Sequence, residues 1–353
     1  MKTIKHLLKA VGIVLGIVVL ILVLAVAYLT LREYRPDAVE EISPAGGIQT
    51  LKSGDTFSVT TFNTGYAGLD ASEDFFMDGG TRVQPDSAEE IQENLTGISG
   101  ILKETRSDVY FLQEVDRDSK RSYHIDEAAY YEKALGMTGM FAHNFKCDFV
   151  PYPLPPIGKV ESGLVSLTAL AVGRASRISL PESFSWPVKT CNLKRCMLEM
   201  RIPLEGTDAE LVLINFHLEA YDNGEGRTAQ SNLLKEKLQS EYEAGNYVLA
   251  GGDFNQTFDD ILDKYPLLQT ESWAPQVLSK DSLPEHFAYA IDDTYPTCRL
   301  LNAPYTGSYE DFQVYVLDGF IISDNLKLQE VRVIDRGFQY SDHQPVKITV
   351  KLN

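Results

Sequence analysis

The sequence predicts a mixed α/β sandwich, a fold in which sheets and helices pack in layers. From Phe57 onward, strand-like segments alternate with helix-like segments, which is typical of layered α/β folds. Several of the strand-like segments are separated by short turns that predict local hairpins. Hydrophobic residues make up 44% and charged residues 23% of the 353 residues, an ordinary composition for a chain that buries a sizeable core.

The N-terminal segment predicts a membrane anchor. Residues Ala10 to Leu31 form 22 positions without a charged side chain, enough to cross a bilayer as a helix. Three lysines precede this stretch, and this excess of positive charge predicts that residues 1–9 are cytoplasmic and that the rest lies outside. The alternative is a signal peptide cleaved after Ala25-Val26-Ala27, but apolar sequence continues beyond that site. We expect an uncleaved transmembrane helix over residues 10–31.

Residues 32–54 are rich in Pro and Gly and predict a linker to a domain over residues 55–353. The first strand is expected at Phe57–Asn63, which alternates apolar and polar side chains. Asp86, with Glu89 three residues later, predicts the start of a helix.

The later elements follow from the same patterns. Strands are expected at Val109–Leu112, Gly163–Val172, Met197–Pro203, Leu211–Phe216, Tyr247–Ala250, Val314–Ile322 (interrupted by Asp318) and Val346–Leu352, with a helix at Arg227–Tyr242. Two loops, over residues 64–85 and 144–160, are rich in Gly or Pro and are expected to border a site or merely to connect strands.

The charge balance limits the kinds of partner. The whole chain has a net charge of −18, and residues 36–353 carry 27 basic and 49 acidic side chains, a net charge of −22. Such a field repels polyanions at long range. It therefore argues against a protein that grips duplex nucleic acid through many phosphate contacts, although it does not exclude a nuclease.

The four cysteines show no metal-ligand spacing, so the sequence does not support zinc-finger or CxxC redox chemistry. A disulfide between Cys191 and Cys196 is compatible with an extracytoplasmic domain. Four free thiols are an equally good expectation.

Polar side chains that bind metals or move protons recur at the ends of the expected strands. Two clusters are densest: Gly-Gly-Asp-Phe-Asn at 251–255 and Ser-Asp-His-Gln-Pro at 341–345. In an extended strand, Asp253 and Asn255 would point to the same side. Carboxylates, an amide and imidazoles that converge at strand ends are what metal-assisted phosphoester cleavage requires. The full set is Asn63, Glu114, His217, Asp253, Asn255, Asp318, Asp342 and His343.

These segments, in this order, resemble the endonuclease/exonuclease/phosphatase superfamily, whose fold is like that of deoxyribonuclease I. The segments are Phe62-Asn63, Gln113-Glu114-Val115, Asn215-Phe216-His217-Leu218, Gly252-Asp253-Phe254-Asn255, Leu317-Asp318-Gly319-Phe320 and Ser341-Asp342-His343-Gln344-Pro345. The resemblance covers about residues 55–352. It implies a four-layer α/β/β/α sandwich of two mixed sheets, preceded here by one transmembrane helix.

The resemblance also implies a role for each polar residue. Glu114 would bind Mg²⁺ directly, with Asn63 beside it and Asp342 completing the metal side. Mn²⁺ and Ca²⁺ are the alternative ions.

On the catalytic side, Asp253 would orient or deprotonate the attacking water. Asn255 and His217 would donate hydrogen bonds to the phosphate or the leaving group. His343 would stabilise phosphate charge or assist proton transfer, with Asp318 fixing its tautomer. Four basic residues are further candidates for phosphate contacts: Arg117, Arg121, Lys146 and Arg195.

We therefore expect a Mg²⁺-dependent phosphoric ester hydrolase on the extracytoplasmic face of a membrane, acting by in-line attack of water. The family acts on several classes of phosphoester, so the substrate is expected to be a lipid headgroup, a small phosphoester or nucleic acid. The alternatives are an extracytoplasmic endonuclease or exonuclease, and an inactive binding module of the same fold. Nothing in the sequence indicates a protein partner.

Overall fold

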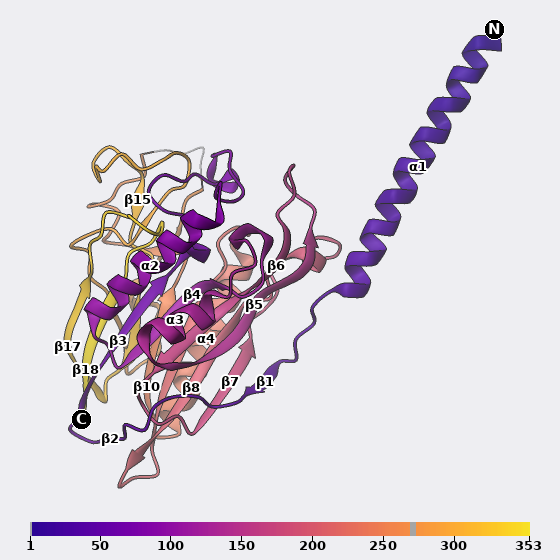
Figure 1. The fold of residues 1–353 in the computed structure, drawn as a ribbon. Helices are drawn as coiled ribbons and strands as arrows, with labels where there is room; N and C mark the ends of the chain where they lie inside the picture. Colours follow the sequence, from indigo (N-terminus) through magenta and orange to yellow (C-terminus); the bar gives the residue numbers. More distant parts are fainter. Residues whose placement is uncertain (1, 269–272) are drawn as a thin grey trace.

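Two β-sheets face each other in the computed structural model of the chain, which describes residues 2–268 and 273–353 (Figure 1). The eight-stranded sheet has the order β1(Val39–Ile42), β7(Arg174–Ser179), β8(Cys196–Glu205), β9(Glu210–His217), β10(Tyr247–Asp253), β16(Asp318–Ser323), β13(Phe287–Ala290), with β2(Leu51–Lys52) pairing β8. The six-stranded sheet has the order β17(Leu326–Val333), β18(Val346–Leu352), β3(Thr56–Asn63), β4(Val109–Asp116), β6(Gly158–Thr168), β5(Thr138–Val150). Each sheet contains parallel and antiparallel pairs.

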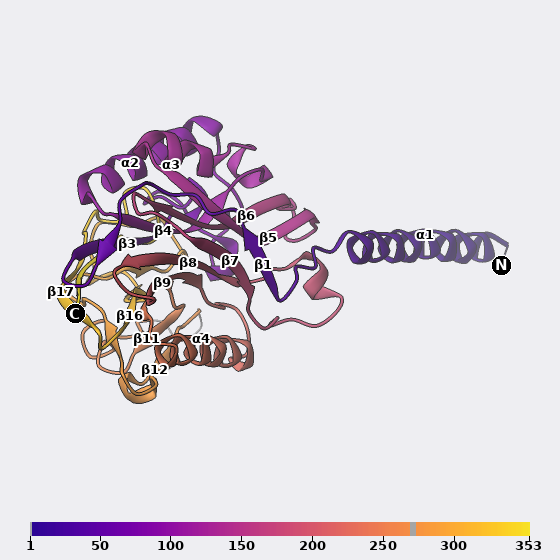
Figure 2. The same cartoon turned by 90° about the horizontal axis from the view of Figure 1, so that it is seen from below.

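Helices cover the outer faces of both sheets, as Figure 2 shows edge-on. The helices α2(Ala88–Thr105) and α3(Glu127–Leu135) pack on the six-stranded sheet, whereas α4(Glu225–Glu243) packs on the eight-stranded sheet. The domain is therefore a four-layer α/β/β/α sandwich of two mixed sheets, which confirms the predicted fold class.

The period of two along each strand separates the inner core from the outer ones. On β9, Leu211 and Leu213 face the other sheet, while Val212 and Ile214 face α4. The same parity on β4 sends Phe111 inward.

A hydrogen-bonded pair of amides closes one end of this inner core. Gln113 on β4 and Asn215 on β9 continue the inward-facing series, and both are fully buried. Gln113 Nε2 donates to Asn215 Oδ1 at 2.7 Å, and Asn215 Nδ2 donates to the carbonyl oxygens of Leu112 and Val165 at 3.2 and 3.0 Å. These bonds tie the two sheets together where apolar packing ends.

Several element boundaries differ from the expected ones. The cap of α2 is Ser87 rather than Asp86, because the Ser87 hydroxyl accepts from the Glu90 amide. The expected strand at 163–172 is β6, which begins at Gly158 and ends at Thr168.

The expected strand at 314–322 is two strands. Its first part, β15(Val314–Tyr315), pairs with β14(Cys298–Arg299), and β16 begins at Asp318 in the large sheet. Another small sheet pairs β11(Gln256–Phe258) with β12(Gln276–Leu278). The loop expected at 144–160 is mostly strand, because β5 extends to Val150 and β6 starts at Gly158.

The N-terminal segment is the helix α1(Lys2–Arg32), which projects from the domain (Figure 1). By length and composition it could cross a membrane. The expected linker over 32–54 is only in part a linker, because β1 pairs with β7 and β2 pairs with β8. These short strands fasten the segment after α1 to the domain.

All four cysteines are free thiols in the described part of the chain, so Cys191 and Cys196 do not form a disulfide here. Cys196 is fully buried at the start of β8, whereas Cys191 lies half-buried in the short helix η4(Val188–Cys191).

We expect Asn215→Ala to lower the free energy of unfolding by about 2–3 kcal/mol, because it leaves buried amide and carbonyl groups without partners. Urea denaturation of the full chain in detergent, followed by circular dichroism, measures this loss. Asn232→Ala, an exposed position on α4, is the matched control and should change stability by less than about 0.5 kcal/mol. Equal stability of the two variants would contradict the role of the amide pair.

Candidate active site

The polar residues singled out from the sequence meet at the end of the sandwich beyond the Gln113–Asn215 pair. There the ends of β3, β4, β9 and β10 and the beginning of β16 surround a cavity of about 700 Å³. Strand parity explains the convergence, because Asn63, His217 and Asp253 each continue the inward-facing series of their strands. Asp318 precedes the inward-facing Phe320 by two residues.

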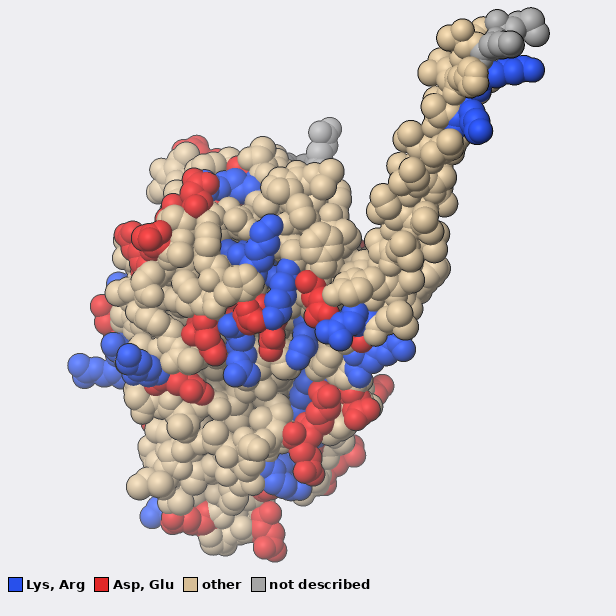
Figure 3. Space-filling model, turned by 45° about the vertical axis from the view of Figure 1, so that its right-hand side comes forward, with Lys and Arg blue, Asp and Glu red and all other residues tan. Residues whose placement is uncertain are grey.

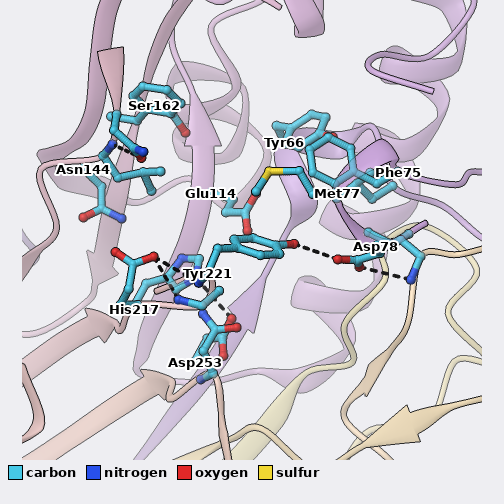
Figure 4. A pocket seen from close by; sticks show the side chains of 18 of the residues that line it. Tyr66, Phe75, Met77, Asp78, Glu114, Asn144, Ser162, His217, Tyr221 and Asp253 are labelled. Atoms are coloured by element: carbon cyan, nitrogen blue, oxygen red, sulfur yellow. Dashed lines mark hydrogen bonds and ion pairs between the residues drawn. The ribbon is translucent and has the colours of Figure 1, made fainter. Parts of the chain in front are cut away.

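Glu114 reaches the cavity through a break in this parity. Regular alternation would place it on the helix-covered face with Leu112, which packs in the cluster beneath α2. Instead, the register between β4 and β6 shifts between Leu112 and Val115, and Glu114 has a φ of 53°. A left-handed conformation at a residue other than glycine costs about 1–3 kcal/mol and is often found at functional sites. The bulge turns the Glu114 side chain into the cavity (Figure 4).

Asn63 holds two carboxylates together. Its Nδ2 lies 3.1 Å from Glu114 Oε1 and 3.1 Å from Asp253 Oδ2, and its Oδ1 accepts from the Gly65 amide. Asn63 is almost fully buried. It therefore acts as a bridge behind the cavity rather than as part of its lining.

Asp253 is the central acceptor of the site. Its Oδ2 lies 3.3 Å from His217 Nε2 and 3.7 Å from His343 Nε2, and its Oδ1 accepts from the Asn255 amide at 2.8 Å. Burial raises the pKa of Asp253 to about 7, with a further increase from the charge of Asp318, while His343 opposes the shift. A carboxylate with such a pKa can exchange a proton near neutral pH.

His343 and Asp318 form a buried pair, with Nδ1 and Oδ2 2.8 Å apart. Burial alone lowers the pKa of His343, but the charge of Asp318, followed by Cys298 and Asp253, outweighs it and raises the pKa well above the ordinary value. This contact is the one that the family resemblance implies, and His343 lines the cavity.

His217 is held in its neutral form. Burial, then the charges of Arg195 and His343, lower its pKa well below the ordinary value. Its buried Nδ1 has no hydrogen-bond partner in the described residues.

Asn255 lines the cavity in a conformation that strand geometry does not give. It has a φ of 49°, and its Nδ2 donates to the Leu218 carbonyl at 2.8 Å. Asp253 and Asn255 therefore do not form an extended pair on one side of a strand, which corrects the expectation from their spacing.

Asp342 completes an acidic corner beside Glu114. Burial and, to a smaller extent, Glu114 raise the pKa of Asp342 to about 7, while His343 and Arg299 oppose the shift. A Cβ built on Gly65, whose φ is 51°, would lie 2.8 Å from Asp342 Oδ1, so only glycine leaves room here. Two mutually repelling carboxylates, the buried Asp342 and the partly buried Glu114, fit a hard divalent cation.

The four basic candidates separate into two groups. Arg121 and Arg195 line the cavity, and both are already paired: the partly buried Arg121 with Asp116 at 2.9 Å and the buried Arg195 with Glu219 at 3.4 Å. Arg121 also lies over the Tyr66 ring.

Arg117 and Lys146 do not reach the cavity. Arg117 lies against Phe141 and 3.8 Å from Asp126, and Lys146 is exposed near Tyr34. The structure therefore gives these two residues no geometric basis as phosphate contacts.

The sequence analysis missed a hydrogen bond that spans the cavity. Tyr221 donates to Asp78 at 2.9 Å, as Figure 4 shows. Asp78 comes from the 64–85 loop, while Tyr221 follows β9 by a few residues. The two residues are far apart in sequence and belong to no motif, so the only available signal was that this loop could border a site.

A comparison with solved structures finds that the fold of this chain is similar to that of endonuclease/exonuclease/phosphatase proteins. The protein of that description from Beutenbergia cavernae DSM 12333 has 17% identity over 84% of this chain and 72% of its own, with a TM-score of 0.57. The chain has the endonuclease/exonuclease/phosphatase fold. A Bacteroides vulgatus protein of the same description has 15% identity over 85% of this chain and 100% of its own, with a TM-score of 0.54.

The human Nocturnin catalytic domain, solved with a bound sulfate anion, shares the endonuclease/exonuclease/phosphatase fold at 16% identity, over 87% of this chain and 97% of its own, with a TM-score of 0.52. No family model matches the chain, and no curated protein matches it in sequence. At these identities the likeness establishes the fold, so the chemistry has to be argued from the cavity itself.

Proposed function

We propose that this chain is a divalent-metal-dependent phosphoric ester hydrolase that cleaves a phosphodiester or phosphomonoester by in-line attack of water, with its domain on the extracytoplasmic side of a membrane. The observation that carries the proposal is that the Nε2 atoms of His217 and His343 both lie within 4 Å of Asp253 Oδ2. This cluster lies in the same cavity as the Glu114–Asp342 corner, on a fold shared with endonuclease/exonuclease/phosphatase proteins.

The acidic corner is the proposed metal site. Glu114 and Asp342 would hold the ion, and Asn63 would fix the Glu114 carboxylate through its hydrogen bond. Mg²⁺ is the favoured ion because it prefers carboxylate oxygens, with Mn²⁺ and Ca²⁺ as alternatives. When bound, such an ion supplies Lewis-acid stabilisation of charge on phosphoryl oxygens.

The remaining groups would orient water and receive the phosphate. Asp253 would accept the proton of the attacking water, since its raised pKa suits a base near neutral pH. His343, kept charged by Asp318, would donate from Nε2 to a phosphoryl oxygen. Neutral His217 and the Asn255 amide are proposed as further donors, and Arg121 and Arg195 would contribute positive charge from the wall.

A nuclease is the main alternative, but the net charge of −22 over residues 36–353 disfavours a polyanionic substrate. An inactive binding module would not need its carboxylates and imidazoles to converge. A hydrolysis panel separates these alternatives: it would test plasmid DNA, RNA, sphingomyelin, phosphoinositides and bis(4-nitrophenyl) phosphate with Mg²⁺, Mn²⁺ or Ca²⁺. If the chain hydrolyses none of these substrates with any of the ions, the inactive binding module is the remaining alternative.

Glu114→Gln should reduce hydrolysis by about 100-fold or more and weaken Mg²⁺ binding, because an amide oxygen lacks the charge that a hard cation prefers. Activity against Mg²⁺ concentration and isothermal titration calorimetry measure the two effects. Glu93→Gln, at an exposed position on α2, is the control. Native activity of Glu114→Gln at low Mg²⁺ would refute the metal assignment.

His343→Ala should lower kcat by about 1,000-fold, as when a donor to transition-state charge is removed. Asp318→Asn should cost about 10- to 100-fold, because the imidazole remains but loses the partner that orients it. The double variant should be little worse than His343→Ala, since residues that act as a unit are non-additive. Fully additive losses would mean that the two residues act independently.

The full chain should sediment with membranes, and protease added outside intact cells should digest the domain, because α1 is apolar and three lysines precede its core. Immunoblots of fractions before and after protease measure both properties. A cytoplasmic protein is the control for intact cells. Recovery of a soluble form that begins near Tyr28 would show cleavage after Ala27 and contradict the anchor.

A further inference from the structure

The end of α1 is docked against the domain rather than joined to it by a free linker. Leu29 is buried among Phe145, Val150 and neighbouring apolar residues of the β5–β6 hairpin. Arg32 Nε lies 2.6 Å from Asp148 Oδ2 at the outer end of β5. In Figure 1 the hairpin points to the side of the domain from which α1 projects.

A second set of contacts fixes the same junction from the other side. Trp186 Nε1 donates to Thr30 Oγ1 at 3.1 Å, and Lys194 pairs with Glu33 at 2.9 Å with both side chains buried. Residues 10–31 of α1 carry no charged side chain, and Figure 3 shows Lys, Arg, Asp and Glu crowded on the domain below the base of the helix. If α1 spans a bilayer, the hairpin end therefore lies at the membrane surface.

Large apolar side chains are exposed at this junction. Leu154 is 88% exposed at the turn between β5 and β6, and Trp186 is 59% exposed before η4. We call this group the rim; its members are Phe149, Tyr152, Leu154, Trp186 and Val188. Exposed apolar patches usually mark an interaction surface, and Trp and Tyr favour the headgroup level of a bilayer.

The rim is continuous with one wall of the active-site cavity. Tyr152 and Val188 belong to both, and the wall continues inward through Val150, Ile157 and Leu193. The same cavity is also lined by Asp253, His217 and His343 and by the acidic corner. One cavity thus runs from an apolar mouth beside the membrane anchor to a polar end that suits a phosphate.

We propose that the rim contacts the bilayer in which α1 is anchored, and that the substrate is a membrane phospholipid drawn in by its headgroup. Its phosphate would reach the Asp253 cluster, while its apolar part would lie along the Val150–Leu193 wall. This inference rests on the proposed hydrolase function and names its substrate class. The placement of the rim follows from the docked helix and does not depend on activity.

The placement is tested by fluorescence, because the chain has two tryptophans. The full chain is reconstituted in phosphatidylcholine vesicles with and without lipids brominated in the acyl chains. Trp273→Phe leaves only Trp186 emission, which should fall by about twofold in brominated vesicles, as expected for a ring at the interface. Trp186→Phe leaves only Trp273 emission, which should change far less. If the two variants are quenched equally, or if neither is quenched, the placement is overturned.

The substrate class is tested with variants outside the cavity lining. Phe149→Asp combined with Leu154→Asp should lower hydrolysis of vesicle sphingomyelin or phosphoinositides by about tenfold, because it removes apolar contacts with lipid. Hydrolysis of soluble bis(4-nitrophenyl) phosphate should stay within about twofold of native. Ile48→Asp, at a 96% exposed position between β1 and β2, is the matched control and should retain both activities.

The outcomes separate the two proposals. If the native chain hydrolyses the soluble diester but no vesicle lipid, the lipid inference fails and the hydrolase proposal stands. If the double variant keeps native lipid hydrolysis, the rim has no role in substrate capture. If the native chain hydrolyses none of the substrates of the panel, nucleic acids included, with any of the three ions, the hydrolase proposal itself fails.

Discussion

The change from apolar to polar contact between the two sheets organises the whole domain. Leu213 and Phe111 belong to a dry core, and one step further along the same strands Gln113 and Asn215 exchange a buried hydrogen bond. Beyond that bond, the ends of β4, β9 and β10 bring Glu114, His217 and Asp253 to the cavity. A satisfied amide pair at this boundary costs little, whereas a half-satisfied one would destabilise both sheets.

Glu114 reaches the site only because β4 departs from regular strand geometry at this residue. Asn63, His217 and Asp253 arrive by strand parity, but Glu114 needs a bulge and a left-handed backbone. The surrounding ladder holds that conformation, since β4 lies between β3 and β6. The strain is local, and the hydrogen bond from Asn63 directs the carboxylate once the backbone has turned.

Strand parity made much of the fold and of the cavity predictable. Period-two segments such as Phe57–Asn63 and Leu211–Phe216 lie in strands. The contact between His343 and Asp318 was implied by the family resemblance and not by strand parity. Features that depend on contacts between distant residues could not be predicted from the sequence. Strands such as β5 are hidden by proline-rich surroundings, Asn255 adopts a local turn, and the Tyr221–Asp78 bond joins two loops that share no motif. The exposure of Arg117 and Lys146 likewise depends on tertiary packing.

The docked end of α1 has a consequence for how the domain explores its surroundings. A domain on a long flexible tether samples a hemisphere of solution, whereas contacts at Leu29, Arg32 and Glu33 leave this one little freedom to tilt. If α1 spans a bilayer, encounters of the domain with membrane-borne molecules occur by lateral diffusion in a plane. For such molecules the turnover rate would follow their mole fraction in the membrane rather than their bulk concentration, and adding inert lipid would slow the protein by surface dilution.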